Sequence, residues 1–338
     1  MAGTSTPALA AAVSNAGGLG SIGVGATTAE KARGMIADLR AATNRPFNVN
    51  VFCHRPSNAD PAREAAWITK LAPAFKRFGV EPPQELREIY KSFVADEAMF
   101  ELFMMERPAV ASFHFGLPSP AKIAALRSAG ITLLASATNL EEAKIVAAAG
   151  IDAVVAQGYE AGGHRGVFDP AAPDERLGTL ALTRLLVRHL KIPVIAAGGI
   201  MDGAGIVACL TLGASAAQMG TAFVACPETD ADGGYRAALL DRSNVRTVMT
   251  TAISGRPARC IVNKFTAMGE DIPVEEIAPY PMAYDAGKAL NAAAKAKGDT
   301  GYGAQWAGQA AALARVLPAT ELMSELQREM EQAFSARI

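Results

Sequence analysis

The sequence predicts an α/β fold of the TIM (β/α)8-barrel type, with its first strand missing and a mainly helical lid inserted late in the chain. Seven short apolar runs alternate with helical segments, which is typical of a parallel sheet covered by helices on both faces. Glycine-rich loops follow several late runs, whereas a doubly wound sheet usually carries its glycine fingerprint after the first strand. Because the chain opens in a helix, we expect the remaining strand to lie before Met1, with Met1-Ala-Gly3 as the loop that follows it.

The expected elements alternate from the start of the chain. A first helix begins at Pro7, after the hydroxyl residues 4–6, and ends at Gly17-Gly18. Apolar, β-branched runs predict strands at 19–24, 47–52, 109–115, 132–136, 153–156, 193–197 and 216–221. Helical periodicity predicts helices at 28–39, 119–129, 140–149, 178–190 and 203–212, and one long helical region at 60–106.

This alternation stops after Phe223, which suggests three parts of the chain. Residues 1–226 are expected to form the βα barrel, and residues 227–304, with helical stretches at 234–241 and 282–297, a mainly helical lid over it. Residues 305–338 contain an amphipathic helix that could return to the outer ring of the barrel.

Composition excludes several classes of function. The chain has 338 residues, of which 50% are hydrophobic and 19% charged, so it can bury a large core. A net charge of -1 provides no broad attraction for nucleic acid or anionic membrane. The four cysteines are scattered, and no uncharged run is long enough for a membrane span. We expect a cytoplasmic protein without disulfides and leave a homodimer open.

A glycine-rich loop at 156–166 follows the fifth expected strand and combines Gln157, Tyr159, Glu160, His164 and Arg165. Glycine lets backbone approach a ligand closely, and histidine has an ordinary pKa near neutral. His164 is therefore the candidate general base. The alternative is a turn whose polar groups only cap neighbouring helices.

The other histidines do not suggest a metal site. His114 ends a strand and is expected to pack behind the site, whereas His54 and His189 are expected at the surface. All four histidines lack the short-spaced partners of a hydrolytic metal centre, and no nucleophile elbow is present. We expect no bound metal.

Two further loops indicate a phosphate site. The last two expected strands run into Gly198-Gly199 and into Gly220-Thr221, where barrels commonly hold a phosphate through backbone amides. Glycines required for tight packing are the alternative. Asn50 and Gln157 add neutral amides at other strand ends, and such groups can bind the edge of a heterocycle.

In combination these motifs resemble class I nitronate monooxygenases, formerly called 2-nitropropane dioxygenases. The matching segments span nearly the whole chain: 1–3, 12–20, 46–50, 112–116, 157–166, 197–199, 218–221, 301–303 and 306–309. The resemblance implies an FMN-dependent barrel with a lid that oxidises small anionic nitronates, notably propionate 3-nitronate, with O2 and without a metal. It implies a carbonyl product and nitrite or nitrate, His164 as the active-site base, and FMN held by Met1, Ala2, Gly3, Asn50, Gln157, Gly162, Gly198, Gly199, Gln218, Gly220 and Thr221.

The same resemblance implies substrate contacts from the lid and neighbouring loops. The candidates are Tyr90, Tyr235, Tyr280, Tyr284 and Lys288. If residues 280–288 are helical, their spacing of four puts Tyr280, Tyr284 and Lys288 on one helix face, which suits an anion. An exposed helix face without a ligand is the alternative for these residues.

Two other functions remain open from the sequence. The glycine-histidine loop also resembles FMN-dependent NAD(P)H:quinone or enoyl-thioester reductases of related barrels. A barrel without its first strand could instead bind flavin weakly, or serve as a structural subunit.

Overall fold

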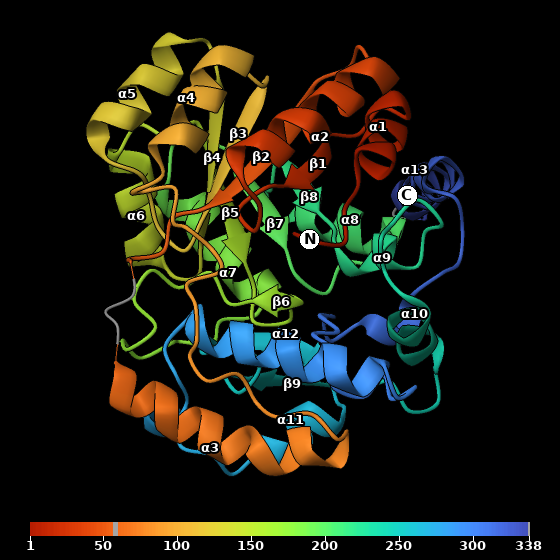
Figure 1. The fold of residues 1–338 in the computed structure, drawn as a ribbon. Helices are drawn as coiled ribbons and strands as arrows, with labels where there is room; N and C mark the ends of the chain where they lie inside the picture. The colour runs from red at the N-terminus through yellow and green to blue at the C-terminus, as the bar shows by residue number, and fades with distance from the viewer. Residues whose placement is uncertain (57–59, 337–338) are drawn as a thin grey trace.

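We describe the protein from a computed structural model, in which residues 1–56 and 60–336 are described (Figure 1). A seven-stranded sheet with the order β1-β2-β3-β4-β5-β7-β8 and only parallel neighbours curls into part of a barrel. Its strands are β1 (Gly20–Gly23), β2 (Phe47–Phe52), β3 (Val110–His114), β4 (Thr132–Ala137), β5 (Ala153–Gln157), β7 (Val194–Ala197) and β8 (Ala216–Gln218). The seven expected strands and the TIM-type α/β fold are confirmed.

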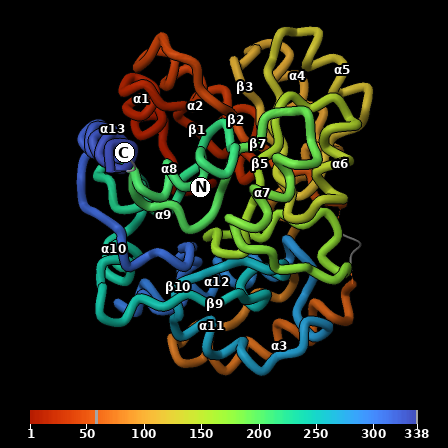
Figure 2. The backbone as a smooth tube through the Cα atoms, turned by 180° about the vertical axis from the view of Figure 1, so that it is seen from behind, coloured from red at the N-terminus to blue at the C-terminus, as the bar shows by residue number. Residues whose placement is uncertain are grey.

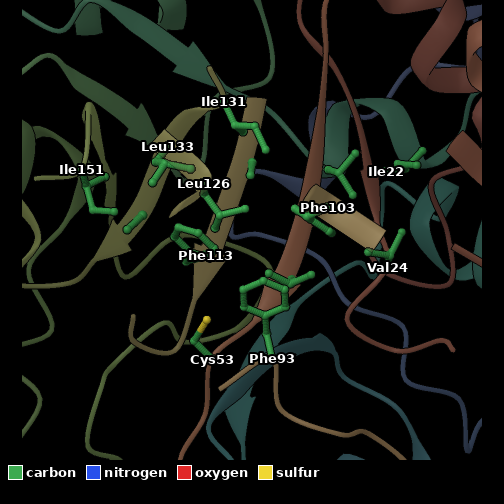
Figure 3. Close-up of a cluster of buried hydrophobic side chains, with 14 of the residues drawn as sticks. Ile22, Val24, Cys53, Phe93, Phe103, Phe113, Leu126, Ile131, Leu133 and Ile151 are labelled. Carbon is green, nitrogen blue, oxygen red and sulfur yellow. The ribbon is translucent and has the colours of Figure 1, made fainter. Parts of the chain in front are cut away.

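Helices cover the outer face of this sheet. They are α1 (Pro7–Asn15), α2 (Ala29–Ala42), α4 (Glu97–Glu106), α5 (Pro120–Ser128), α6 (Leu140–Ala148), α7 (Thr179–His189) and α8 (Gly203–Thr211). The largest core lies between helices and strands, where Phe93, Phe103 and Phe113 pack together (Figure 3). Alternate strand residues such as Val49 and Val51 join this core. Their neighbours Asn48 and Asn50 therefore point into the barrel.

The barrel interior holds both apolar and polar side chains. Leu134, Ala153, Val155 and Ala197 form a small buried cluster inside the sheet. Between strands β2 and β3, the side chains of Asn48 and Asn50 both donate to Ser112 Oγ at 2.9 Å. Parallel barrels place a ligand site at the C-terminal ends of the strands, where His114 and Gln157 are the last residues of β3 and β5.

A second core lies outside the barrel and is built from two distant parts of the sequence. Helix α3 (Pro61–Arg77) packs against α12 (Met282–Lys295), and Trp67, Leu71 and Phe75 are buried there with Phe265 and Leu290. Figures 1 and 2 show α3 and α12 together on the side of the molecule away from α1 and α2. The expected division at residue 226 places residues 61–86 with the barrel, whereas their buried side chains join this second core.

The expected long helical region at 60–106 is wrong. Helix α3 ends at Arg77 and α4 begins at Glu97, and no described residue between them is helical. Pro82-Pro83 lies in this gap, and proline cannot donate the backbone hydrogen bond that a continuing helix requires.

Besides its helices, the lid contains a small sheet that the sequence did not predict. A three-stranded antiparallel sheet with the order β6-β10-β9 joins β6 (Gly163–His164) to β9 (Thr247–Thr250) and β10 (Ala258–Ile261). The helical elements around it are α9 (Thr221–Val224), α10 (Gly233–Leu240), α11 (Lys264–Met268), η1 (Val274–Glu276) and α12. The sheet ties the lid directly to the glycine-histidine loop.

The C-terminal part returns to the barrel. After η2 (Ala311–Leu313), helix α13 (Ala319–Ser335) packs against α8 and α1. Leu322 and Leu326 are buried in this contact. Strands β1 and β8 form the two edges of the seven-stranded sheet. The expected strand before Met1 stays a prediction.

Candidate active site at the lid side of the barrel

His164 lies where the barrel and the lid sheet meet. His164 is the β-sheet partner of Ala258 in β10. Its backbone oxygen accepts hydrogen bonds from His114 Nε2 at 3.1 Å and from Gln157 Nε2 at 3.0 Å. Gln157 Oε1 accepts from Gly166 N at 2.7 Å. Gln157 therefore braces both sides of the histidine loop. Its expected contact with FMN stays a prediction.

Arg165 holds the same loop through its buried side chain. Its guanidinium donates to Gln157 O at 2.5 Å and pairs with Asp174 at 2.9 Å, and its side chain is buried. Gly162 fixes the other end, because a Cβ there would come within 2.5 Å of Gly308 N. The loop is held on all sides, so the position of His164 is defined by contacts outside its own segment.

The ring of His164 lies among aromatic side chains. Ring centroids are 5.1 Å from Trp306, 5.5 Å from Tyr280 and 5.6 Å from Phe115. Its Nε2 lies 2.9 Å from Ser254 Oγ, and no described residue hydrogen-bonds to Nδ1. Burial, then the nearby His114 and Arg256, lowers the pKa of His164 to about 3. The ring is neutral at physiological pH, and Nδ1 is the nitrogen available to a ligand.

Three of the expected phenols gather around this ring. Tyr90 lies 6.3 Å from Tyr280 and 5.5 Å from Tyr284 between ring centroids. Tyr284 lies 6.0 Å from His164. Burial raises the pKa of Tyr284 to about 12 and raises the pKa values of Tyr90 and Tyr280 as well. All three phenols therefore stay protonated and can donate hydrogen bonds to an anion.

Lys288 brings a positive charge to this cluster. Its Nζ lies 4.8 Å from the ring centroid of Tyr90 and 5.3 Å from that of Tyr284, and it forms no ion pair among the described residues. Desolvation lowers its pKa. Tyr284 and Lys288 share a face of α12 as expected, whereas Tyr280 precedes the helix, which starts after Pro281. Tyr280 still reaches the cluster from the preceding turn.

Tyr235 lies in a different environment. Its hydroxyl donates to the Trp306 carbonyl, and its ring belongs to the core around α9, α10 and η2. It supports the segment that carries Trp306. Its expected contact with a substrate stays a prediction.

The glycine loops at the ends of β7 and β8 lie side by side, since Ala197 pairs with Gln218. Among the described residues, no group accepts a hydrogen bond from the backbone N–H of Gly199, Gly220 or Thr221. Thr221 Oγ1 accepts from Gly308 N at 3.0 Å, and Gln218 is exposed. Free N–H groups on adjacent loops are what an anion site requires.

The first residues reach the same end of the sheet. A Cβ on Gly220 would lie 3.6 Å from Met1 Sδ, and one on Gly23 would lie 3.0 Å from Ala2 Cα. Met1 to Gly3 therefore lie between the two edge strands, beside the free amides.

Sequence reasoning missed several residues of the site. Ser254 and Arg256 precede β10, and Arg256 stacks on Phe115 at 4.2 Å while its guanidinium donates to Val167 O. The expectation of His54 at the surface is wrong, because the ring is 1% exposed and packs 5.0 Å from Tyr280. His114 packs behind the site as expected and hydrogen-bonds Ser136 at 2.9 Å. His189 is exposed.

Burial of three neutral histidines predicts acid sensitivity. Burial lowers the pKa of His54 and His114 to about 4 and that of His164 to about 3, from an ordinary value of 6.5. Between pH 6.5 and about 4 the unfolded chain binds protons that the folded chain excludes, so the free energy of unfolding should fall as pH falls. Each histidine contributes about 1.4 kcal/mol per pH unit in this window.

Urea unfolding between pH 7 and 4.5 measures this slope. Replacing His54 with phenylalanine keeps a ring in its place. The dependence of the free energy of unfolding on pH should then weaken by the contribution of one histidine, about 1.4 kcal/mol per pH unit. A slope unchanged by this substitution would contradict the neutral, buried state of His54.

No group of His, Cys, Asp and Glu side chains in the described part of the chain could hold a metal ion. No described helix has the length and apolarity to cross a membrane.

Comparisons with known proteins identify the family. A family model described as nitronate monooxygenase matches residues 1–329. A nitronate monooxygenase of Paraburkholderia phytofirmans is 66% identical over 334 residues, covering 99% of this chain and 91% of the relative. One from Pseudomonas aeruginosa is 56% identical, covering 98% and 94%. The structure of nitroalkane oxidase from Streptomyces ansochromogenes superposes with a TM-score of 0.90 at 40% identity, covering 99% of this chain and 95% of that one. The structure of FabK from Thermotoga maritima also superposes, with a TM-score of 0.75 at 31% identity, covering 100% of this chain and 92% of that one.

Proposed function

The chain belongs to the nitronate monooxygenase family, and from this premise we propose that it is an FMN-dependent enzyme that oxidises alkyl nitronates of the propionate 3-nitronate class with O2. The products would be a carbonyl compound and nitrite or nitrate. One observation carries the proposal: the phenols of Tyr280 and Tyr284 and the ammonium of Lys288 lie around the neutral ring of His164. Such a site binds a small anion beside a proton acceptor.

The residues present fit FMN. The free N–H groups of Gly199, Gly220 and Thr221 suit a phosphate, with Gly198 beside them. On strand β2, no described residue donates to Asn50 Oδ1, and Asn48 Oδ1 is buried without a partner. Neutral amide acceptors of this kind suit the edge of a heterocycle. Met1 to Gly3, Gln157, Gly162 and Gln218 would complete the site.

When bound, FMN would supply the redox chemistry that links the nitronate to O2. The chain itself positions the substrate. Tyr280 and Tyr284 would donate hydrogen bonds to the nitronate oxygens, and Lys288 would balance a second negative charge, such as the carboxylate of propionate 3-nitronate. Phe115 and Trp306 flank the histidine ring and would keep water away from the reacting carbon.

His164 is needed only when the substrate arrives neutral. Its Nδ1 would then take the α-proton of a nitroalkane, and the electron pair of the broken C–H bond would pass into the nitro group to give the nitronate. A nitronate that is already ionised requires no such step.

Oxygen uptake and nitrite formation test the proposal. The purified protein supplemented with FMN should consume O2 with propionate 3-nitronate and produce nitrite. Oxidation of NADH with a quinone, and no O2 uptake with the nitronate, would instead favour the reductase function.

A lysine substitution tests how the substrate carboxylate is held. Lys288→Met should raise KM for propionate 3-nitronate by about 10–100-fold, since a hydrogen bond to a charged group contributes about 1.5–3 kcal/mol. The effect on ethyl nitronate, which has no carboxylate, should be smaller. Steady-state O2 uptake measures both.

Lys295→Met is the matched control, because Lys295 lies on the same helix and pairs with Asp232 outside the site. Equal changes in KM for both substrates in Lys288→Met would contradict a carboxylate contact.

A further inference from the structure

We infer that Ser254 is a positioning residue for His164: it keeps the ring proton on Nε2 and leaves Nδ1 as the proton acceptor. The inference rests on the proposed function in one respect only, namely that His164 takes a proton from a neutral nitroalkane. Which nitrogen carries the ring proton can be measured without any turnover.

The hydrogen bonds around Ser254 determine the direction of the contact. Ser254 Oγ donates to the backbone oxygen of Arg256 at 3.1 Å and lies 2.9 Å from His164 Nε2. A serine hydroxyl has one proton to donate. Among the described residues, that hydroxyl is the sole donor to the Arg256 carbonyl, and Arg256 is buried. Since leaving a buried carbonyl unpaired is costly, the hydroxyl proton stays on it, and Ser254 Oγ accepts from Nε2–H.

The neutral state of the ring completes this assignment. Burial lowers the pKa of His164 to about 3, so the ring carries a single proton at neutral pH. With that proton on Nε2, Nδ1 holds a lone pair. When Nδ1 takes the substrate proton, Ser254 Oγ also stabilises the positive ring that forms, as the third group of a catalytic triad does.

The backbone holds Ser254 rigidly in place. Ser254 is fully buried in the turn between β9 and β10, where Gly255 N donates to Thr251 O at 2.7 Å. Gly255 has φ +83, and a Cβ on it would come within 2.5 Å of Ala278 O and 2.7 Å of Tyr280 N. The turn therefore packs against the segment that carries Tyr280. The lid thus fixes the proton acceptor and the anion-binding phenols together.

A second histidine provides a contrast within the same site. His114 Nε2 faces the His164 carbonyl, which can only accept, so His114 carries its proton on Nε2. Its Nδ1 then accepts from Ser136, which lies 2.9 Å away. Ser136 therefore donates a hydrogen bond to His114, whereas Ser254 accepts one from His164.

Nitrogen NMR of the full chain labelled with ¹⁵N-histidine tests the assignment, because a protonated ring nitrogen and a bare one have widely separated shifts. His164→Asn identifies the signals of His164. We expect a protonated Nε2 and a bare Nδ1 in the unaltered chain. Ser254→Ala should move the ring proton partly to Nδ1, because Nε2–H would then be buried without an acceptor. Ser254→Thr, which retains the hydroxyl, and Ser136→Ala should keep the original pattern.

Turnover then tests the consequence. In Ser254→Ala we expect kcat/KM for neutral nitroethane to fall about 10-fold, at the lower end of the effect of groups that orient a reacting residue. The loss on ethyl nitronate should be clearly smaller, and Ser254→Thr should restore nitroethane turnover. An unchanged His164 tautomer in Ser254→Ala, or equal losses on both substrates, would overturn the inference. If His164→Asn reduced the turnover of nitroethane and of ethyl nitronate equally, His164 would not be the base. The NMR comparison would still decide whether Ser254 sets the tautomer of His164.

Discussion

Replacing His164 with asparagine should slow the turnover of neutral nitroethane by about 10²–10⁴-fold, the usual contribution of a general base. Turnover of pre-ionised ethyl nitronate should change far less, because no proton has to be removed from it. Asparagine retains polar atoms near Ser254 but has no basic nitrogen, so the substitution removes the chemistry more than the packing. O2 uptake with each substrate under identical conditions gives the two ratios.

His189→Asn is the control for this comparison, since His189 is exposed on α7 and hydrogen-bonds only its own helix in the described structure. It should leave both substrates unaffected. Equal losses of nitroethane and ethyl nitronate turnover in His164→Asn would instead assign His164 to substrate binding.

The barrel could be predicted because its signals are local. Each strand is a short apolar run, and most of the helices that follow begin at a capping side chain, as where Asn139 accepts from Glu142 N at 2.8 Å. In strand β2, the alternation of apolar and polar residues predicts which side chains face the helices. Val49 and Val51 face the helices, and Asn50 faces the site. Local patterns of this kind need no knowledge of distant partners.

The lid could not be predicted in the same way. Helix α3 joins the second core through contacts with α12, more than 200 residues later, and Lys70 of α3 also pairs with Glu276 of η1. Strand β6 has only two residues and exists because β10 pairs with it. Short strands stabilised by distant partners carry no periodic signal of their own.

The same distinction applies to the site. The glycine-rich loop made His164 visible in the sequence. Ser254 is 90 residues away and is brought to His164 by the pairing of β6 with β10. His54 follows a strand closely enough to be taken for a loop residue, yet Tyr280 of the lid covers it. His164 could be predicted because its own loop marks it as a site residue. Ser254 and His54 could not, because their positions in the site depend on contacts with a segment that is distant in the sequence.

The proposed phosphate cradle can be tested without turnover. Gly220→Val should weaken FMN binding by about 10²–10⁴-fold, because a branched side chain would project where the N–H groups of Gly220 and Thr221 are free. Two hydrogen bonds to a charged group, at about 1.5–3 kcal/mol each, account for a loss of this size. The fold should persist, since a Cβ at Gly220 meets only the Met1 side chain, at 3.6 Å.

Quenching of flavin fluorescence on titration gives the Kd for FMN, and circular dichroism checks the fold. Gly34→Val is the matched control, because Gly34 is exposed on α2 and a Cβ there meets no atom within 4 Å. This variant should bind FMN as the unaltered chain does. If Gly220→Val retained the same Kd, the phosphate would have to be held elsewhere, and the free amides at the ends of β7 and β8 would need another ligand.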